Sequence, residues 1–293
     1  MRIAVLGAAG QLGRELLRVL PRATTIPLTR ADVDLAAEPA RVRDRLAAAA
    51  PAVVVNAAAD NRVDAAEADP RPAVAVNALA PGVLARACAD LGAWCVQVST
   101  DYVFDGRARR PYAEDDAPNP LGAYARSKLA GELLVRTLAP RHAVVRVAGL
   151  YAAGGSRGKG GSFVDRVLER ARRGEPLRIV DDQVTAPTWA RDVAGTLARL
   201  LPRLVRGELP GGIFHVTNAG ECSWYDFARA ALALAGLTAP IEPVATATFG
   251  APAPRPAYSV LANTRLAAAG EPPLRDWRAA LAAYLAEPSP PAA

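Results

Sequence analysis

Tyr124 and Lys128 stand four positions apart, a spacing that could support acid–base chemistry. On a helix, residues at this spacing share one face, so the phenol and the ammonium group would be neighbours. A phenol titrates near pH 10, and an adjacent cation lowers that pKa because it favours the phenolate. The pair therefore predicts a general acid, Tyr124, whose pKa is lowered by Lys128. The alternative is the solvated face of an ordinary amphipathic helix.

Hydroxyl and carboxyl side chains follow the apolar run at residues 93–98. The run indicates a buried strand, and Ser99, Thr100 and Asp101 come directly after it. Open α/β sheets bind their ligands at the carboxyl ends of strands. We therefore expect Thr100 to lie close to Tyr124.

A glycine pattern at the N-terminus is typical of a dinucleotide site. Residues 2–6 indicate a strand, residues 7–13 have the spacing Gly-x-x-Gly-x-x-Gly, and residues 14–20 have helical apolar spacing. In this context the glycines let the backbone approach a pyrophosphate, whose charge is met by amides at the helix N-terminus. The spacing differs from Gly-x-Gly-x-x-Gly, and a purely structural glycine turn is the alternative.

Arg30 follows the second expected strand, at residues 24–28, which carries no acidic residue at its tip. An acidic residue there would bind the ribose hydroxyls of NAD, whereas arginine accommodates the 2′-phosphate of NADP. Arg30 thus favours NADPH. NADH stays possible, because a solvated arginine explains the position nearly as well.

Strands and helices alternate over residues 1–150, which predicts a Rossmann-type, doubly wound parallel sheet that binds NAD(P). Further strands are expected at residues 53–59 and 143–147, and further helices at residues 39–50, 64–69, 73–91 and 124–138. Residues 151–286 are expected to form mainly a smaller C-terminal substrate-binding lobe, with segments that return to the first domain. Within them, residues 152–161 predict a mobile glycine-rich loop, residues 162–173 a helix, and residues 177–180 and 212–216 strands. Residues 287–293 predict a flexible tail.

Composition excludes several classes of protein. The net charge of +6 comes from 35 basic and 29 acidic residues, and the arginines are scattered, so we expect no nucleic-acid partner. No apolar stretch approaches the roughly 20 residues of a membrane span, and no secretory signal precedes the first strand, so we expect a cytoplasmic protein without a membrane partner. No Gly-x-Ser-x-Gly elbow is present, which disfavours a hydrolase.

The three cysteines and two histidines lack metal-ligand spacing, so no metal site is expected. His215 lies within an apolar run and is interpreted as a hydrogen-bonded core residue. The cysteines are interpreted as reduced buried thiols.

In this order, the glycine pattern, Thr100 and the Tyr124/Lys128 pair resemble the short-chain dehydrogenase/reductase superfamily. A narrower set of motifs resembles its dTDP-4-dehydrorhamnose reductase family, and these motifs span nearly the whole chain. They are STDYVFDG at residues 99–106, NAAA at 56–59, VD at 63–64 with AE at 66–67, AGE at 130–132, DQ at 182–183 with PT at 187–188, SWY at 223–225 and RP at 255–256. The octapeptide is the most specific of them.

The resemblance implies NAD(P)H-dependent reduction of the C4 ketone of a dTDP-6-deoxy-hexulose, giving dTDP-L-rhamnose. It implies that Thr100 hydrogen-bonds the carbonyl oxygen, that Tyr124 delivers the proton, and that Lys128 lowers the pKa of Tyr124 while holding the cofactor ribose. Cofactor contacts are expected at Gly7, Gly10, Gln11, Leu12, Gly13, Arg30, Asp34, Leu35, Ala57, Ala58, Tyr124 and Lys128. Substrate contacts are expected at Asp101, Val103, Gln183, Thr188 and Arg255.

Three departures from the family pattern leave the sugar open. Gly149 stands where the family usually has a tryptophan near the substrate sugar, Val184 and Thr185 replace a small turn, and the loop at residues 152–161, with Arg157 and Lys159, is longer and more basic than usual. One alternative is a related nucleotide-sugar 4-ketoreductase for another deoxysugar. Another is a non-catalytic subunit resembling the regulatory subunit of methionine adenosyltransferase. Some family members are magnesium-dependent dimers, so Mg²⁺ and a homodimer also stay open.

Overall fold

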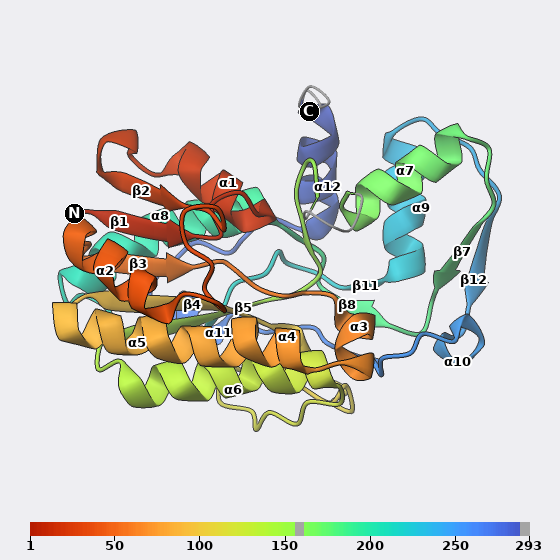
Figure 1. The fold of residues 1–293 in the computed structure, drawn as a ribbon. Helices are drawn as coiled ribbons and strands as arrows, with labels where there is room; N and C mark the ends of the chain where they lie inside the picture. The colour runs from red at the N-terminus through yellow and green to blue at the C-terminus, as the bar shows by residue number, and fades with distance from the viewer. Residues whose placement is uncertain (156–160, 288–293) are drawn as a thin grey trace.

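The computed structural model describes residues 1–155 and 161–287. A six-stranded parallel sheet forms its centre, in the order β10-β5-β4-β3-β1-β2 (Figure 1). These strands are β1 (Ile3–Leu6), β2 (Thr25–Leu28), β3 (Val53–Asn56), β4 (Trp94–Thr100), β5 (His142–Val147) and β10 (Gly212–His215). The strand order reverses beside β1, as in doubly wound folds. The predicted fold class is confirmed.

Helices cover both faces of this sheet because alternate strand residues point to opposite sides. Ile3 and Val5 pack with α1 (Gln11–Val19) and α8 (Ala190–Val205), whereas Ala4 and Leu6 pack with α2 (Pro39–Ala49), α5 (Ala80–Leu91) and α6 (Ala123–Leu138). Figure 1 shows these two groups of helices above and below the sheet. Both cores are apolar, so every strand of the centre is buried, as parallel sheets require.

The expected helix at residues 73–91 is longer and contains a wide turn. It runs as α4 (Arg71–Val74), a π-helical segment (Ala75–Leu79) and α5, after a short α3 (Val63–Ala68). At 21 residues it is long and apolar enough to cross a membrane, so the expectation that no stretch approaches that length was wrong. Half of its most apolar window is buried against the rest of the protein, as in the core helix of a domain.

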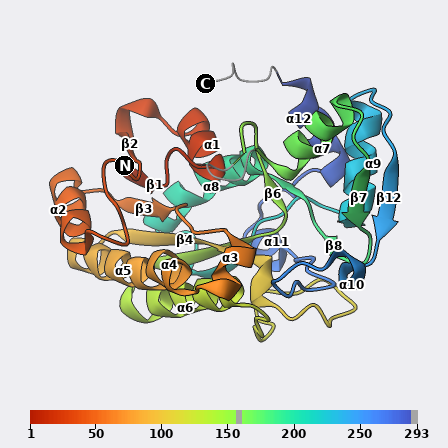
Figure 2. The ribbon, with the colours of Figure 1, turned by 45° about the vertical axis from the view of Figure 1, so that its right-hand side comes forward.

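A second hydrophobic core lies beyond the carboxyl ends of the strands, and we call this part the second lobe (Figure 2). Tyr151, Phe227 and Trp277 are fully buried in it. Its helices are α7 (Phe163–Arg172), α9 (Trp224–Leu234), α10 (Thr246–Phe249) and α12 (Trp277–Ala286). Its strand pairs are β7 (Leu177–Val180) with β12 (Ile241–Val244), β8 (Val184–Thr185) with β11 (Cys222–Ser223), and β6 (Leu150–Tyr151) with β9 (Thr188–Trp189).

The chain between α10 and α12 returns to the first domain. There α11 (Thr264–Ala268) packs beside β10, and Tyr112 forms a bridge with Leu261. The expected helix at residues 162–173 is confirmed as α7. Ser162 is its N-cap, and its hydroxyl accepts a hydrogen bond from the Asp165 amide.

The structure corrects two boundaries. β4 continues through Ser99 and Thr100, which were expected in a loop, and both pair with β5. Glu287, expected in a flexible tail, makes an ion pair with Arg191 at 2.8 Å. Residues 288–293, like Arg157 and Lys159 of the glycine-rich loop, lie outside the described residues.

Candidate active site

Thr100 and Tyr124 meet at the carboxyl edge of the sheet. Thr100 ends β4, opposite Val147 of β5, and its hydroxyl lies beside the phenol of Tyr124. Tyr124 lies in the first turn of α6, whose start is fixed by Glu67 accepting a hydrogen bond from the Ala123 amide at 2.6 Å. The predicted proximity of Thr100 and Tyr124 is therefore found.

Lys128 lies one turn along α6, where its side chain is buried. Its Nζ donates a hydrogen bond to the carbonyl oxygen of Val98 at 2.7 Å. Burial lowers the pKa of Lys128 to about 8, although the carboxylate of Glu132 opposes this shift. A substantial neutral fraction therefore exists near physiological pH.

The expected lowering of the Tyr124 pKa by Lys128 was wrong for this structure. The pKa of Tyr124 is raised, because the phenol is removed from water and because the Asp101 carboxylate lies nearby. The nearby Thr100 hydroxyl opposes the rise in pKa without overcoming it. Tyr124 is thus held as a protonated phenol, the form that can donate a proton.

Aromatic packing fixes the phenol. The Tyr102 ring meets the Tyr124 ring edge-to-face, with centroids 6.1 Å apart and planes at 84°. Arg255 lies beside Tyr102 and forms an ion pair with Asp64 at 2.8 Å. Arg255, an expected substrate residue, therefore stands at the site by bracing Tyr102.

Asn77 is a site residue for which the sequence prediction gave no role. Its side chain donates to the Ser127 hydroxyl at 3.0 Å and to the Asp60 carbonyl at 2.8 Å, and accepts from the Asp60 amide at 2.9 Å. Asn77 lies in the π-helical segment, a distortion often found at functional sites. The available sequence signal was an asparagine within a long alanine-rich helix.

The N-terminal glycine turn is built for close approach of backbone. Gly7 has φ +73°, and a Cβ there would lie 2.6 Å from the Ala58 amide nitrogen. A Cβ on Gly13 would lie 2.2 Å from the Gly7 carbonyl oxygen. Side chains are thus excluded where the turn meets the end of β3, at Ala57 and Ala58.

The N-terminus of α1 suits an anion. No acidic residue lies in its first turn, and the Gly10 N-cap offers no side chain to cap the amides. Leu12 points into the core, so only its backbone can face a ligand. These residues fit a pyrophosphate group.

The expected adenosine side lies after β2. The Arg30 side chain is 88% exposed and forms an ion pair with Asp34 at 3.0 Å. Asp34 also accepts a hydrogen bond from the Ala36 amide at 3.0 Å, and Leu35 is partly buried beside it. Arg30 is therefore positioned by Asp34 while its charge stays accessible to a polyanion.

Four of the expected substrate residues are buried or hydrogen-bonded to other residues of the protein. Asp101 and Val103 are buried, and Gln183 donates to the Thr246 hydroxyl at 2.8 Å. Thr188 is fully buried and donates to the Ala186 carbonyl at 2.9 Å. A contact between the Thr188 side chain and a substrate is therefore not supported, because this buried hydroxyl is hydrogen-bonded to the Ala186 carbonyl and the Asn218 amide.

Trp224 lies beside Gly149, just beyond the end of β5. Gly149 has φ +50°, and a Cβ there would lie 3.5 Å from the Trp224 indole and 3.1 Å from the Pro187 Cα. The indole packs on Phe163, with centroids 4.7 Å apart. An aromatic ring from α9 thus borders the space that a side chain at position 149 would enter.

A buried ion pair ties α6 to the sheet behind the site. Arg146 and Glu132 are both fully buried, and their closest atoms are 2.7 Å apart. His215 hydrogen-bonds the carbonyls of Tyr112 and Ala262, each at 3.1 Å, and burial lowers its pKa to about 4. His215 is therefore a neutral core histidine, which confirms its predicted role.

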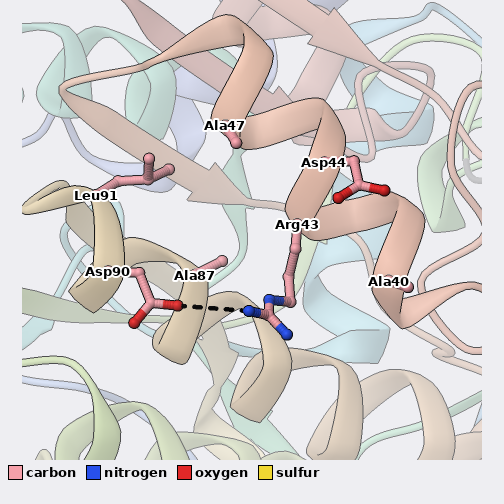
Figure 3. Close-up of a pocket in the computed structure, with 7 residues that line it drawn as sticks. All are labelled: Ala40, Arg43, Asp44, Ala47, Ala87, Asp90 and Leu91. Atoms are coloured by element: carbon pink, nitrogen blue, oxygen red, sulfur yellow. Dashed lines mark ion pairs between the residues drawn. The ribbon is translucent and has the colours of Figure 1, made fainter.

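A hollow on the surface of the described residues lacks this chemistry. A surface hollow between α2 and α5 is crossed by an ion pair of Arg43 with Asp90 at 3.9 Å (Figure 3). It lies at the C-terminal end of α5, the edge of the sheet opposite to Thr100. Within residues 1–155 and 161–287 no group of three or more His, Cys, Asp or Glu residues is placed to hold a metal ion.

Comparison with known proteins agrees with this geometry. The family described as "RmlD substrate binding domain" matches residues 1–289. A dTDP-4-dehydrorhamnose reductase of Streptomyces griseus is 43% identical over 284 residues, covering 96% of this chain and 91% of that protein. A probable dTDP-4,6-dihydroxy-2-methyloxan-3-one 4-ketoreductase of Streptomyces antibioticus is 42% identical, covering 96% and 93%.

A solved structure extends the likeness to three dimensions. It is a dTDP-4-dehydrorhamnose reductase from Bacillus anthracis in complex with NADP, with a TM-score of 0.90 and 30% identity, covering 97% of this chain and 98% of that one. Together with the matched motifs, these similarities confirm the predicted resemblance. The chain belongs to the dTDP-4-dehydrorhamnose reductase family.

Proposed function

We propose that this protein reduces the C4 ketone of dTDP-4-dehydro-L-rhamnose to the alcohol of dTDP-L-rhamnose, with NADPH as the reductant. The observation that carries the proposal is the close placement of Thr100 and Tyr124 at the carboxyl edge of the parallel sheet, next to the glycine turn. The relatives named as reductases of this sugar support the substrate.

The glycine turn and α1 would hold the cofactor pyrophosphate. The backbone at Gly7, Gly10 and Gln11 lies at a helix N-terminus without acidic residues, and Gly13 lets α1 pack close behind the turn. Arg30 meets a 2′-phosphate on the adenosine side, next to Asp34 and Leu35, and the NADP in the related structure supports this preference. When bound, the nicotinamide supplies the hydride.

The side chains of the site orient the ketone and supply the proton. Thr100 hydrogen-bonds the carbonyl oxygen, and Tyr124 gives its phenolic proton to that oxygen as charge develops on it. Lys128 lies within α6 one turn from Tyr124 and would hold the cofactor ribose while it stabilises the phenolate left behind.

The second lobe would hold the dTDP-sugar over this edge. Gln183, Arg255 and the backbone around Val103 lie on the segments that face it, and Trp224 supplies an apolar surface beside Gly149. We place the reaction in the cytoplasm, where nucleotide sugars are made, with a homodimer as the possible assembly. Nucleic acid and membranes have no part in it.

The test is consumption of NADPH by the purified protein with enzymatically prepared dTDP-4-dehydro-L-rhamnose, with and without Mg²⁺. NADH and the sugar that has not been epimerised serve as comparisons. Rapid consumption with identification of dTDP-L-rhamnose is the expected result. A protein that binds NADPH but reduces no dTDP-ketosugar would contradict the proposal and would favour a regulatory subunit, a function that none of the named relatives supports.

A second candidate is reduction of another dTDP-4-ketosugar. Gly149 and Trp224 favour it, because the wall beside the site is formed by an indole from α9 instead of a side chain at position 149. The Streptomyces antibioticus relative is named for such a sugar. A higher kcat/KM with a different 4-ketosugar in the same assay would establish this alternative.

A further inference from the structure

The buried carboxyl group of Asp101 lies directly behind the Thr100–Tyr124 pair. Its Oδ1 is 2.9 Å from the Thr100 hydroxyl, and the residue is only 3% exposed. Its Oδ2 is buried and has no hydrogen-bond partner among the described residues. A carboxylate in this position would keep one charged oxygen away from water and without a hydrogen-bond partner, which favours the neutral acid.

The surroundings of Asp101 agree with a carboxyl group that changes its protonation state in the working range of pH. Burial raises its pKa to about 6, although the hydroxyls of Ser259 and Thr100 favour the carboxylate. The titratable groups that face it are Tyr102 and Tyr124, both protonated phenols with raised pKa values. Next outward lie Arg255 and Asp64 beside Tyr102, and Asp60 beside Tyr124.

The hydrogen bonds of Thr100 determine which way the protons point. A hydroxyl has one hydrogen and two acceptor sites, and the Tyr102 amide occupies one acceptor site of Thr100 at 3.2 Å. One hydrogen and one acceptor site are left for Asp101 and the ketone oxygen, and the ketone oxygen can only accept. If Asp101 is ionised, Thr100 must donate to it, so Thr100 has no hydrogen left for the ketone.

If Asp101 is neutral, the hydrogen bond between Asp101 and Thr100 runs in the opposite direction. Asp101 then donates to Thr100, and the Thr100 hydrogen is free to face the ketone oxygen beside the Tyr124 proton. The Asp101–Thr100 pair thus has two arrangements, of which only one lets Thr100 donate to the substrate.

We propose that Asp101 is a positioning residue whose neutral form donates to Thr100 and so frees the Thr100 hydrogen to face the ketone next to the Tyr124 proton. The inference rests on the proposed reduction of a dTDP-4-ketosugar. No bond is made to Asp101 in this step, and the hydride and the Tyr124 proton account for the two hydrogens gained by the product.

The test compares the pH dependence of kcat for the wild-type protein, Asp101→Asn and Asp101→Leu between about pH 5 and pH 9. Wild-type kcat should fall at least about tenfold between pH 6 and pH 8, as the carboxyl ionises. The amide of Asp101→Asn donates to Thr100 at every pH, so this variant should stay active and lose that fall. Asp101→Leu should lose at least about 100-fold in kcat at all pH values while NADPH still binds.

Asp105→Asn is the matched control, because Asp105 is a partly exposed carboxylate in the same segment that is bonded to Tyr112 and Asn119. It should keep the wild-type profile. A wild-type profile in Asp101→Asn, or an inactive Asp101→Asn that binds NADPH normally, would overturn the proposal. Absence of any ketosugar reduction by the wild-type protein would instead overturn the proposed function, so the two failures are distinguishable.

Discussion

The backbone carbonyl of Asn77 occupies the place that a side chain on Gly131 would need. A Cβ on Gly131 would lie 2.1 Å from that oxygen, so the absence of a side chain lets α6 contact the π-helical segment. This contact brings the Asn77 side chain to Ser127 and Asp60. The helix that carries Tyr124 and Lys128 is therefore positioned by a close approach of two backbones.

Gly131→Ala should destabilise the protein by about 3 kcal/mol, because backbone must move to admit the methyl group. Gly195→Ala is the matched control, since Gly195 also lies within a helix and a Cβ there would meet only Arg199 at 3.9 Å. It should stabilise by up to about 1 kcal/mol through helix propensity. Urea unfolding of both variants measures the difference, and equal midpoints would contradict the assigned contact.

Lys128→Met should lower kcat at least about 100-fold while making the protein more stable by about 1–2 kcal/mol at neutral pH. The variant loses the catalytic ammonium group and also removes a buried charge, at the expense of one hydrogen bond to Val98. Activity and urea unfolding at pH 7 measure the two effects. A variant that is both inactive and much less stable would contradict the assignment.

The pH dependence of stability provides a second check on Lys128. Its pKa is about 8 in the folded protein, below the ordinary value of 10.5. Between these values the unfolded chain binds more protons than the folded one, so wild-type stability rises with pH relative to Lys128→Met. The difference between the two proteins should therefore shrink as pH rises from 8 to 10, and a constant difference would refute the shift.

Tyr124→Phe should reduce kcat by a factor of about 100 to 10,000, since the phenolic proton is lost while the ring and its contact with Tyr102 remain. The affinity for NADPH, measured by fluorescence titration, should change little. Tyr258→Phe is a matched control, because the Tyr258 hydroxyl is bonded to Glu221 on an exposed segment. Unchanged turnover in Tyr124→Phe would remove Tyr124 from the reaction.

The strand and helix pattern of the first domain was predictable because the spacing of its apolar residues reflects which face of each strand or helix is buried. Thr100, Tyr124 and the glycine turn were found for the same reason, since they sit at the ends of clearly patterned elements. The direction of the Tyr124 pKa was not predictable. It depends on burial and on Asp101, and both are set by packing between segments far apart in the sequence.

The roles of the later residues were harder to predict for a related reason. The buried Thr188 hydroxyl donates a hydrogen bond to the Ala186 carbonyl. Arg255, in contrast, hydrogen-bonds Asp64, which lies 191 positions away in the sequence. Spacing cannot reveal whether a polar side chain is already satisfied by the protein. The same holds for Glu287, whose ion pair with Arg191 joins the end of α12 to α8.

Arg30→Ala should raise the KM for NADPH about tenfold and leave the KM for NADH nearly unchanged. The guanidinium would bind only the 2′-phosphate, and one such charged contact corresponds to roughly 1.4 kcal/mol. Arg41→Ala is the matched control, because Arg41 is also exposed and paired with an acidic neighbour, Glu38, at 3.1 Å. Equal changes for the two cofactors, or the same effect in Arg41→Ala, would show that Arg30 does not select the phosphate.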